Sequence, residues 1–252
     1  MKYFKILALS VLGIFCSSAL ASAQESATYK PLDFSLQIKN MHLWRGYQVT
    51  TSAMGGVDIH LTDKSQRFTF GLWGGASFNS DFKEFDYYAS FQQGGFSIAV
   101  WDIYNFSPGA TYNNRQVFNY NARETGHFVD VALSYQFQHD FPLKITWATI
   151  VFGRDRGVKN EKNLYSTYVS LDYPVVRNKI VDLDLGIAGA FALNKESGSD
   201  ANFYADNPGI VNVNMTVSKK LKLGNYVLPV SAMAMWNPAR NEANIQVAFN
   251  LF

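Results

Sequence analysis

Apolar and polar side chains alternate along most of the chain, in stretches of similar length. Between residues 181 and 191 the odd positions are mainly apolar, whereas the even positions carry Asp182, Asp184 and small residues. Alternation of this kind is typical of strands with one apolar and one polar face. It predicts twelve strands, at 34–50, 55–63, 67–78, 83–93, 95–106, 127–138, 143–155, 164–175, 180–193, 210–222, 227–238 and 243–252.

The predicted strands are long, and their apolar faces are continuous. A strand that crosses a membrane at a tilt needs about 9–11 residues, whereas strands of soluble proteins are more often about 5–6 residues long. Val211, Val213, Met215 and Val217 form one apolar row that we expect to face outward, and a second such row, 165–173, begins and ends with tyrosine. The lengths favour a membrane protein.

The connections differ in length according to their position in the chain. The links after even-numbered strands are tight and carry turn residues, at 63–66, 94, 139–142, 176–179 and 223–226. The links after odd-numbered strands include the long polar segments 107–126, 156–163 and 194–209. This asymmetry is typical of periplasmic turns and extracellular loops. It predicts an all-β fold, a transmembrane antiparallel up-and-down barrel of 12 strands, with both chain ends in the periplasm. The alternative, a secreted β-sandwich, gives no reason for loop length to alternate.

The last predicted strand, "ANIQVAFNLF", should close the barrel. Hydrocarbon cannot satisfy backbone N–H and C=O groups, so each strand must pair along both edges. We therefore expect residues 243–252 to pair with the first and the eleventh strands. The aromatic end of this strand is also the kind of signal that barrel-assembly machinery reads, and we expect that machinery as a partner during insertion.

The N-terminal residues have the pattern of an export signal. A basic start at residues 1–5, an apolar run at 6–16 and small residues before position 24 predict a Sec-type signal peptide at 1–23, followed by a barrel domain at 24–252. Cleavage would remove two of the 22 basic residues and none of the 20 acidic ones, so the mature chain would carry no net charge. It would also lack cysteine, because Cys16 is the only one. We therefore expect no nucleic-acid partner, no disulfide and no thiol nucleophile.

Several segments resemble a known family of small barrels. The segments "LWRGYQVTTSAMGGVDIHL", "FGLWGGASFN", "EFDYYASF" and "GGFSIAVWDIY" resemble the TorF-type porins, a family also filed under the label Gcw_chp. The resemblance covers residues 34–106, with a fainter similarity in "LPVSAMAMWNPARNEANIQVAF", and the family usually has proline where this chain has "SAMGG". It implies an outer-membrane barrel with a porin function, and it supplies neither a substrate nor catalytic residues.

Charged side chains fall on the predicted inward face, where function would lie. We predict that the pore lining includes Arg45, Asp58, His60, Glu84, Asp86, Asp102, Asp130, Lys144, Asp182 and Asp184. Acids outnumber bases in this set, which favours cationic or polyhydroxylated solutes if the lumen is open. The same residues could instead neutralise one another in a plugged lumen, because a twelve-stranded barrel is intermediate in width between filled and open barrels.

Arg45 stands out because an arginine at this height is costly if it faces lipid, about 2–4 kcal/mol near the bilayer midplane. It should therefore point inward. We expect it to meet Asp58 and His60 on the next strand, with Glu84 and Asp86 close by, either as a structural clasp or as a selectivity constriction.

Other classes of function have weaker support in the sequence. An outer-membrane hydrolase would need a rim histidine, for which His127 beside Glu124 and Asp130 is the candidate, but no serine motif accompanies it. Loop 107–126 is rich in Asn and Tyr and could bind a ligand or fold into the barrel mouth. The favoured hypothesis is a monomeric channel in the outer membrane of a Gram-negative bacterium, for passive diffusion of small hydrophilic solutes. We expect outer-membrane lipid around it, and neither a metal, a cofactor nor catalytic residues.

Overall fold

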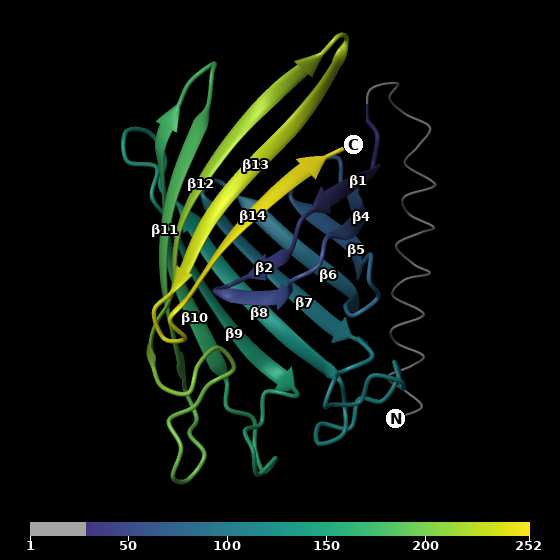
Figure 1. Ribbon diagram of the computed structural model, residues 1–252, viewed down its shortest axis with the longest axis vertical. Helices are drawn as coiled ribbons and strands as arrows, with labels where there is room; N and C mark the ends of the chain where they lie inside the picture. The colour runs from purple at the N-terminus through teal and green to yellow at the C-terminus, as the bar shows by residue number, and fades with distance from the viewer. Residues whose placement is uncertain (1–28) are drawn as a thin grey trace.

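The computed structural model describes residues 29–252, and twelve of its strands form one closed antiparallel barrel (Figure 1). Each barrel strand pairs with the next one along the chain, and β14 pairs with β1 to close the ring. The predicted signal peptide lies outside the described residues. The barrel strands are β1 (Leu32–Lys39), β4 (Met54–Thr62), β5 (Phe68–Ser77), β6 (Lys83–Gln93), β7 (Phe96–Asn105), β8 (His127–Gln136), β9 (Lys144–Gly153), β10 (Ser166–Arg177), β11 (Asp182–Ala192), β12 (Gly209–Leu223), β13 (Tyr226–Asn237) and β14 (Glu242–Asn250).

The predicted fold class is confirmed, and eleven of the twelve predicted strands match a barrel strand to within two residues at each end. The prediction for the first strand is wrong. Residues 34–50 do not form one strand, because the chain leaves the wall after Lys39 and folds into a separate two-stranded sheet, β2 (His42–Trp44) and β3 (Tyr47–Thr50). We call residues 40–53, which contain these two strands, the luminal hairpin.

The two faces of the wall differ as the alternation requires. Outward side chains such as Ile59, Leu185 and Ile187 are more than 40% exposed, as expected of a surface that contacts lipid. Short turns join the strands at one end, which we call the short-turn end, and long connections lie at the other, the loop end (Figure 1). The C-terminus lies at the short-turn end (Figure 1). Tyr29, at the start of the described chain, lies there too, since its hydroxyl donates to the carbonyl of Thr62.

The seam between β1 and β14 is the shortest junction in the barrel. The two strands pair at three positions, Gln37 with Asn250, Ile38 with Phe249 and Lys39 with Ala248. The first residues of β14, from Glu242 to Val247, extend beyond the last residue of β1 at the loop end. This part of the β14 edge therefore has no strand partner in the described chain. The side chain of Asn40 covers some of this edge, accepting from the amide of Val247 at 2.8 Å and donating to the carbonyl of Ile245 at 3.0 Å.

Among residues 29–252, no helix is long and apolar enough to cross a membrane.

Candidate functional site: the luminal hairpin

The luminal hairpin turns at Arg45 and Gly46, which have φ angles of 47° and 87°. Two successive residues with positive φ are what a tight hairpin turn requires. Gly46 is required for a second reason, because a β-carbon there would lie 2.1 Å from the carbonyl oxygen of Val211. Asn237, which is fully buried, donates to the carbonyl of Gly46 at 3.0 Å. The turn therefore rests directly on the inner wall formed by β12 and β13.

A local irregularity in β12 makes room for this contact. The pairing of β11 with β12 shifts by one residue between Ala188 and Gly189, which is a β-bulge. As a result Val211 is fully buried in a cluster with Tyr168 and Tyr204, although the alternation predicted that it would face outward. Met215 and Val217, beyond the bulge, keep the predicted outward orientation.

Arg45 points into the lumen, but its partner is not the predicted one. Its guanidinium donates to both carboxylate oxygens of Asp130, at 2.8 and 2.7 Å, and to the hydroxyl of Tyr204 at 2.9 Å. The guanidinium also lies over the rings of Trp44 and Tyr168. The expected contacts with Asp58, His60, Glu84 and Asp86 are not formed, because the hairpin turns away from β4 and β6 and crosses towards β8. A two-pronged pair to the fully buried Asp130 therefore ties the hairpin to the opposite wall.

Aromatic side chains pack around this ion pair. Trp44 and Tyr47 of the hairpin contact Phe203 and Tyr204 of the connection 193–208, and Trp44 also contacts Phe128 of β8. Tyr204 is fully buried, and the hydroxyl of Tyr47 donates to the carbonyl of Phe203. Two segments about 160 positions apart in the sequence thus meet inside the barrel, each inserted from the loop end.

Two more predicted residues form a polar cluster with an aromatic stack on the inner wall. The ring of His60 contacts the carboxylate of Asp58 at 2.6 Å, and the hydroxyl of Tyr88 donates to the same carboxylate at 2.9 Å. Tyr88 stacks on Trp101 with ring centroids 4.1 Å apart. We call these four side chains the polar–aromatic cluster. The predicted pore lining included Asp58 and His60 but neither aromatic ring, although the alternation in β6 and β7 places Tyr88 and Trp101 on the inner face.

Four more of the predicted acids lie on the inner wall, in two groups. Glu84 accepts from Asn105 at 3.2 Å, and Asp86 accepts from the backbone amide of Tyr104 at 3.2 Å. Asp182 and Asp184 lie on β11 near the short-turn end, where Arg177 forms an ion pair with Asp184. Lys144 is directly opposite Asp172 on the neighbouring strand.

Sequence reasoning missed several bases, and they reduce the predicted acidic excess of the lumen. Lys39 is buried on the inner face, with its ammonium 2.9 Å from the ring of His42. Arg177 reaches the inner face, where it pairs with Asp184, because the register of β10 shifts between Pro174 and Val176. An uninterrupted alternation does not predict this orientation. Arg154 follows the end of β9 and lies in the loop-end mouth, over the inward ring of Phe128.

The prediction that Asp102 lines the lumen is wrong. It lies directly opposite Tyr87, which is on the outward face, and in the same row as the exposed Phe96 and Val100. Its carboxylate accepts from the hydroxyl of Tyr120 at 2.8 Å and contacts the ring of His127 at 2.7 Å. The loop therefore covers this carboxylate on the outside of the wall, which explains how an acid can lie in an apolar row.

Loop 107–126 crosses the rim of the barrel. Tyr112 packs on the guanidinium of Arg154 in the mouth, 4.0 Å from the ring centroid. On the outer side, the carbonyl of Val117 contacts the ring of His127 at 2.7 Å. The two possibilities left open by the sequence, an inward and an outward loop, therefore apply to different parts of the same segment.

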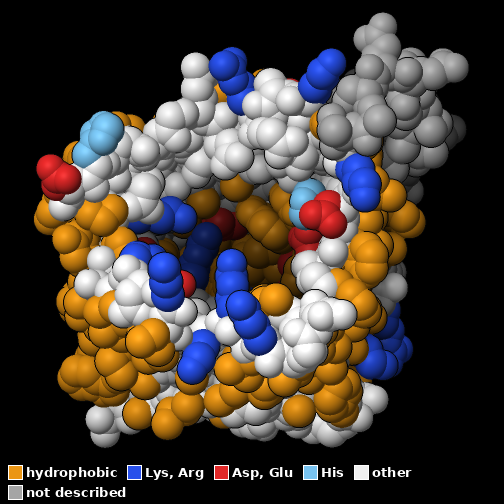
Figure 2. Space-filling view, turned by 90° about the horizontal axis from the view of Figure 1, so that it is seen from above, with side chains coloured by type: hydrophobic (Ala, Val, Ile, Leu, Met, Phe, Trp, Pro, Cys, Tyr) orange, Lys and Arg blue, Asp and Glu red, His pale blue; other side chains and the backbone are white. Residues whose placement is uncertain are grey.

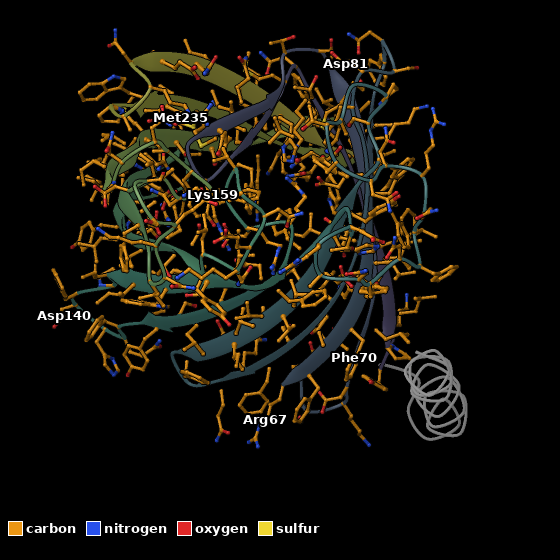
Figure 3. All side chains as sticks on the ribbon, turned by 90° about the horizontal axis from the view of Figure 1, so that it is seen from below. Arg67, Phe70, Asp81, Asp140, Lys159 and Met235 are labelled. Carbon is orange, nitrogen blue, oxygen red and sulfur yellow. The ribbon has the colours of Figure 1, made fainter. Side chains whose placement is uncertain are left out.

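The two ends of the lumen differ. Seen from the short-turn end, the molecule is hollow, with basic, acidic and hydrophobic side chains along the walls of the hollow (Figure 2). Seen from the loop end, side chains crowd into the ring of strands and the connection that carries Lys159 projects over it (Figure 3). The luminal hairpin and the Phe203–Tyr204 insertion occupy that end. The lumen is therefore a vestibule that narrows at the hairpin. In residues 29–252 no group of His, Cys, Asp and Glu is arranged to hold a metal ion.

The comparisons with known proteins give limited information. No protein-family model matches the chain, so the resemblance to TorF-type porins remains a prediction. No curated protein matches either. Among solved structures, the chain is similar to an outer membrane channel from Pseudomonas putida F1, with a TM-score of 0.47 and 12% identity, over 90% of this chain and 96% of that one. At this level of similarity the match does not assign a function.

Proposed function

We propose that the chain is an outer-membrane channel for small hydrophilic solutes, in which the luminal hairpin forms the constriction. The observation that carries the proposal is the pairing of a closed, outwardly apolar barrel with a hollow, charged lumen that narrows at a hairpin tied by one ion pair. A barrel of this kind satisfies its backbone groups in lipid. Charged side chains along a lumen interact favourably with water and polar solutes, whereas a packed apolar core excludes both.

The polar–aromatic cluster supports a preference for polyhydroxylated or cationic solutes. The carboxylate of Asp58 and the stacked rings of Tyr88 and Trp101 lie together on the inner wall. Carboxylates accept hydrogen bonds from hydroxyl groups, and aromatic faces attract cations. The ion pair between Arg177 and Asp184 weakens the case for a strong cation preference set by Asp182 and Asp184 alone.

The experiment is single-channel recording in planar bilayers. We expect small ohmic steps from the natural chain and larger or more frequent openings from Asp130→Asn, because the substitution removes the anionic partner of Arg45. Arg177→Gln is the matched control, since it breaks an exposed pair at the short-turn end and should leave the constriction unchanged. Absence of conductance in all three proteins, each shown to be folded by its heat-dependent gel shift, would contradict the channel.

A second candidate, a barrel with a permanently plugged lumen, is favoured by the aromatic packing of Trp44, Phe203 and Tyr204. The alternative of an outer-membrane hydrolase gains no support from His127, its candidate histidine. Both ring nitrogens of His127 are engaged, one by Asp102 and one by the carbonyl of Val117, and the ring is fully buried.

A further inference from the structure

Arg154 is held in the loop-end mouth by its backbone. It follows Gly153, whose φ is 102° and whose close approach to the carbonyl of His127 leaves no room for a β-carbon. The amide of Arg154 donates to that same carbonyl at 2.9 Å. The start of β8 therefore fixes the point from which the side chain of Arg154 extends into the mouth.

Three aromatic rings surround the guanidinium. The central carbon lies 4.0 Å from the ring centroid of Tyr112, 4.7 Å from that of Phe128 and 5.0 Å from that of Phe203. These rings come from three different segments, namely loop 107–126, β8 and the connection 193–208. Burial among them lowers the pKa of Arg154. Cation–π contacts offset part of the cost of taking the charge out of water, but they leave the N–H groups at the edge of the plane without acceptors.

The guanidinium of Arg154 makes no ion pair and donates no hydrogen bond to any residue that the structure describes, and its Nε is buried without a partner. The nearest acids are occupied elsewhere. Asp155 accepts from both the amide and the hydroxyl of Ser166, at 2.7 Å each, and Glu84 accepts from Asn105.

Arg45 provides the contrast within the same mouth. Its guanidinium also lies over aromatic rings, yet it donates two hydrogen bonds to Asp130 and one to Tyr204. Arg154 is only partly exposed and its Nε is buried, and a guanidinium shielded from water is costly without an acceptor. Among residues 29–252 nothing gives Arg154 the acceptor that Asp130 gives Arg45, and an oxyanion from solution would supply it.

We propose that Arg154 is the recognition residue of a binding site for a carboxylate solute with an apolar or aromatic body. The planar N–H groups match the two oxygens of a carboxylate. The surrounding rings would contact the body of such a solute and keep water away from the ion pair. The site is a binding site in the mouth, and it does not depend on whether the barrel conducts.

The experiment is a binding titration of the folded barrel in detergent micelles, with benzoate as the probe and benzyl alcohol as its uncharged counterpart. Trp44 packs against Phe128 and Phe203, so its fluorescence should report occupancy, and calorimetry should give the affinity independently. We expect saturable binding of benzoate, no binding of benzyl alcohol, and an affinity at least tenfold lower in Arg154→Gln.

The Arg154→Lys variant keeps the charge and should still bind several-fold more weakly, because an ammonium lacks the two-pronged geometry. Arg177→Gln, which removes a distant arginine, should bind as the natural chain does. The heat-dependent gel shift checks that each variant is folded. The proposal would be overturned by failure of the natural chain to bind benzoate, by equal affinities in the natural chain and Arg154→Lys, or by inorganic phosphate binding as tightly as benzoate.

Discussion

At the scale of single residues, the ion pair between Arg45 and Asp130 holds the luminal hairpin in place. Asp130 is fully buried, so replacing it with asparagine would leave the charge of Arg45 without an anionic partner. Removing one member of a buried pair costs about 3–5 kcal/mol. We expect Asp130→Asn to lower the free energy of unfolding by about that amount in a urea titration. Asp184→Asn, in an exposed pair, should cost less than about 1 kcal/mol, and equal losses would contradict this account.

The carboxylate of Asp63, at the short-turn end, should make the stability of the barrel depend on pH. Its carboxylate accepts from the hydroxyl of Ser65 and from the amides of Phe68, Arg67 and Ser65, and these bonds lower its pKa from 3.8 to about 2. A lowered pKa in the folded state means that the stabilisation is complete above pH 3.8 and is lost as the pH falls towards 2.

The measurement is the urea midpoint at pH 7 and at pH 2.5. The drop in midpoint between these two pH values should be smaller for Asp63→Asn than for the natural chain, because the asparagine cannot lose a charge. The effect should be modest, since the turn is exposed. Asp140→Asn is the control, because that carboxylate, in the turn between β8 and β9, accepts no hydrogen bond from the described residues.

The orientation of many side chains could be predicted from the sequence, but their partners could not. Alternation alone places Asp58, Glu84 and Asp184 on the inner face, because the side-chain period of a strand is two. It fails at Val211 because a bulge adds one residue to β12. Asp102 obeys the alternation, but the expectation that an acid must face inward fails there, because a loop covers that part of the outer face and satisfies the carboxylate.

At the scale of elements, the sequence does contain a signal for the luminal hairpin, namely a change in the phase of the alternation. Apolar side chains fall at even positions from Phe34 to Ile38 and then at the odd positions Met41, Leu43, Tyr47 and Val49, with an exception at the turn, where Trp44 precedes Arg45. The phase therefore changes at Asn40, where the chain leaves the wall. A continuous strand would put one of these two sets on the wrong face, so the change of phase marks the end of β1.

Gly46 gives a test of how the hairpin sits on the wall. Alanine at this position would suffer both a positive φ and a 2.1 Å approach to the carbonyl of Val211. Gly224→Ala separates the two effects, because Gly224 has a φ of 64° and open space around it. We expect Gly46→Ala to displace the hairpin and change the fluorescence of Trp44, whereas Gly224→Ala should leave that fluorescence as it is. Identical spectra for the natural chain and Gly46→Ala would show that the turn does not press on β12.

The seam gives a second test at this scale. Asn40 supplies two hydrogen bonds to the backbone edge of β14, so Asn40→Ala should lower the free energy of unfolding by about 1–3 kcal/mol. Hydrogen exchange at the amide of Val247 should accelerate at the same time. Asn244→Ala is the control on the same strand, because its side chain makes no hydrogen bond within the described chain. Unchanged exchange at Val247 would contradict the proposed role of Asn40.

At the scale of the whole molecule, strand number and loop asymmetry were predictable, whereas the filling of the mouth was not. Lipid forces a closed ring and a fixed strand length, and both leave a regular trace in the sequence. The mouth is filled by Trp44, Tyr112 and Phe203, from three connections far apart in the chain. Such contacts depend on shape in three dimensions and leave no periodic signal.

The position of the luminal hairpin also fixes an order of assembly. The hairpin lies near the start of the chain, yet it rests on Asp130, Val211 and Asn237, and the last of these belongs to the penultimate strand. It can reach its final place only after most of the ring has formed around it. During insertion into lipid vesicles, the signal of Trp44 should therefore change later than the appearance of β-sheet, because the hairpin settles after strands that follow it in the chain.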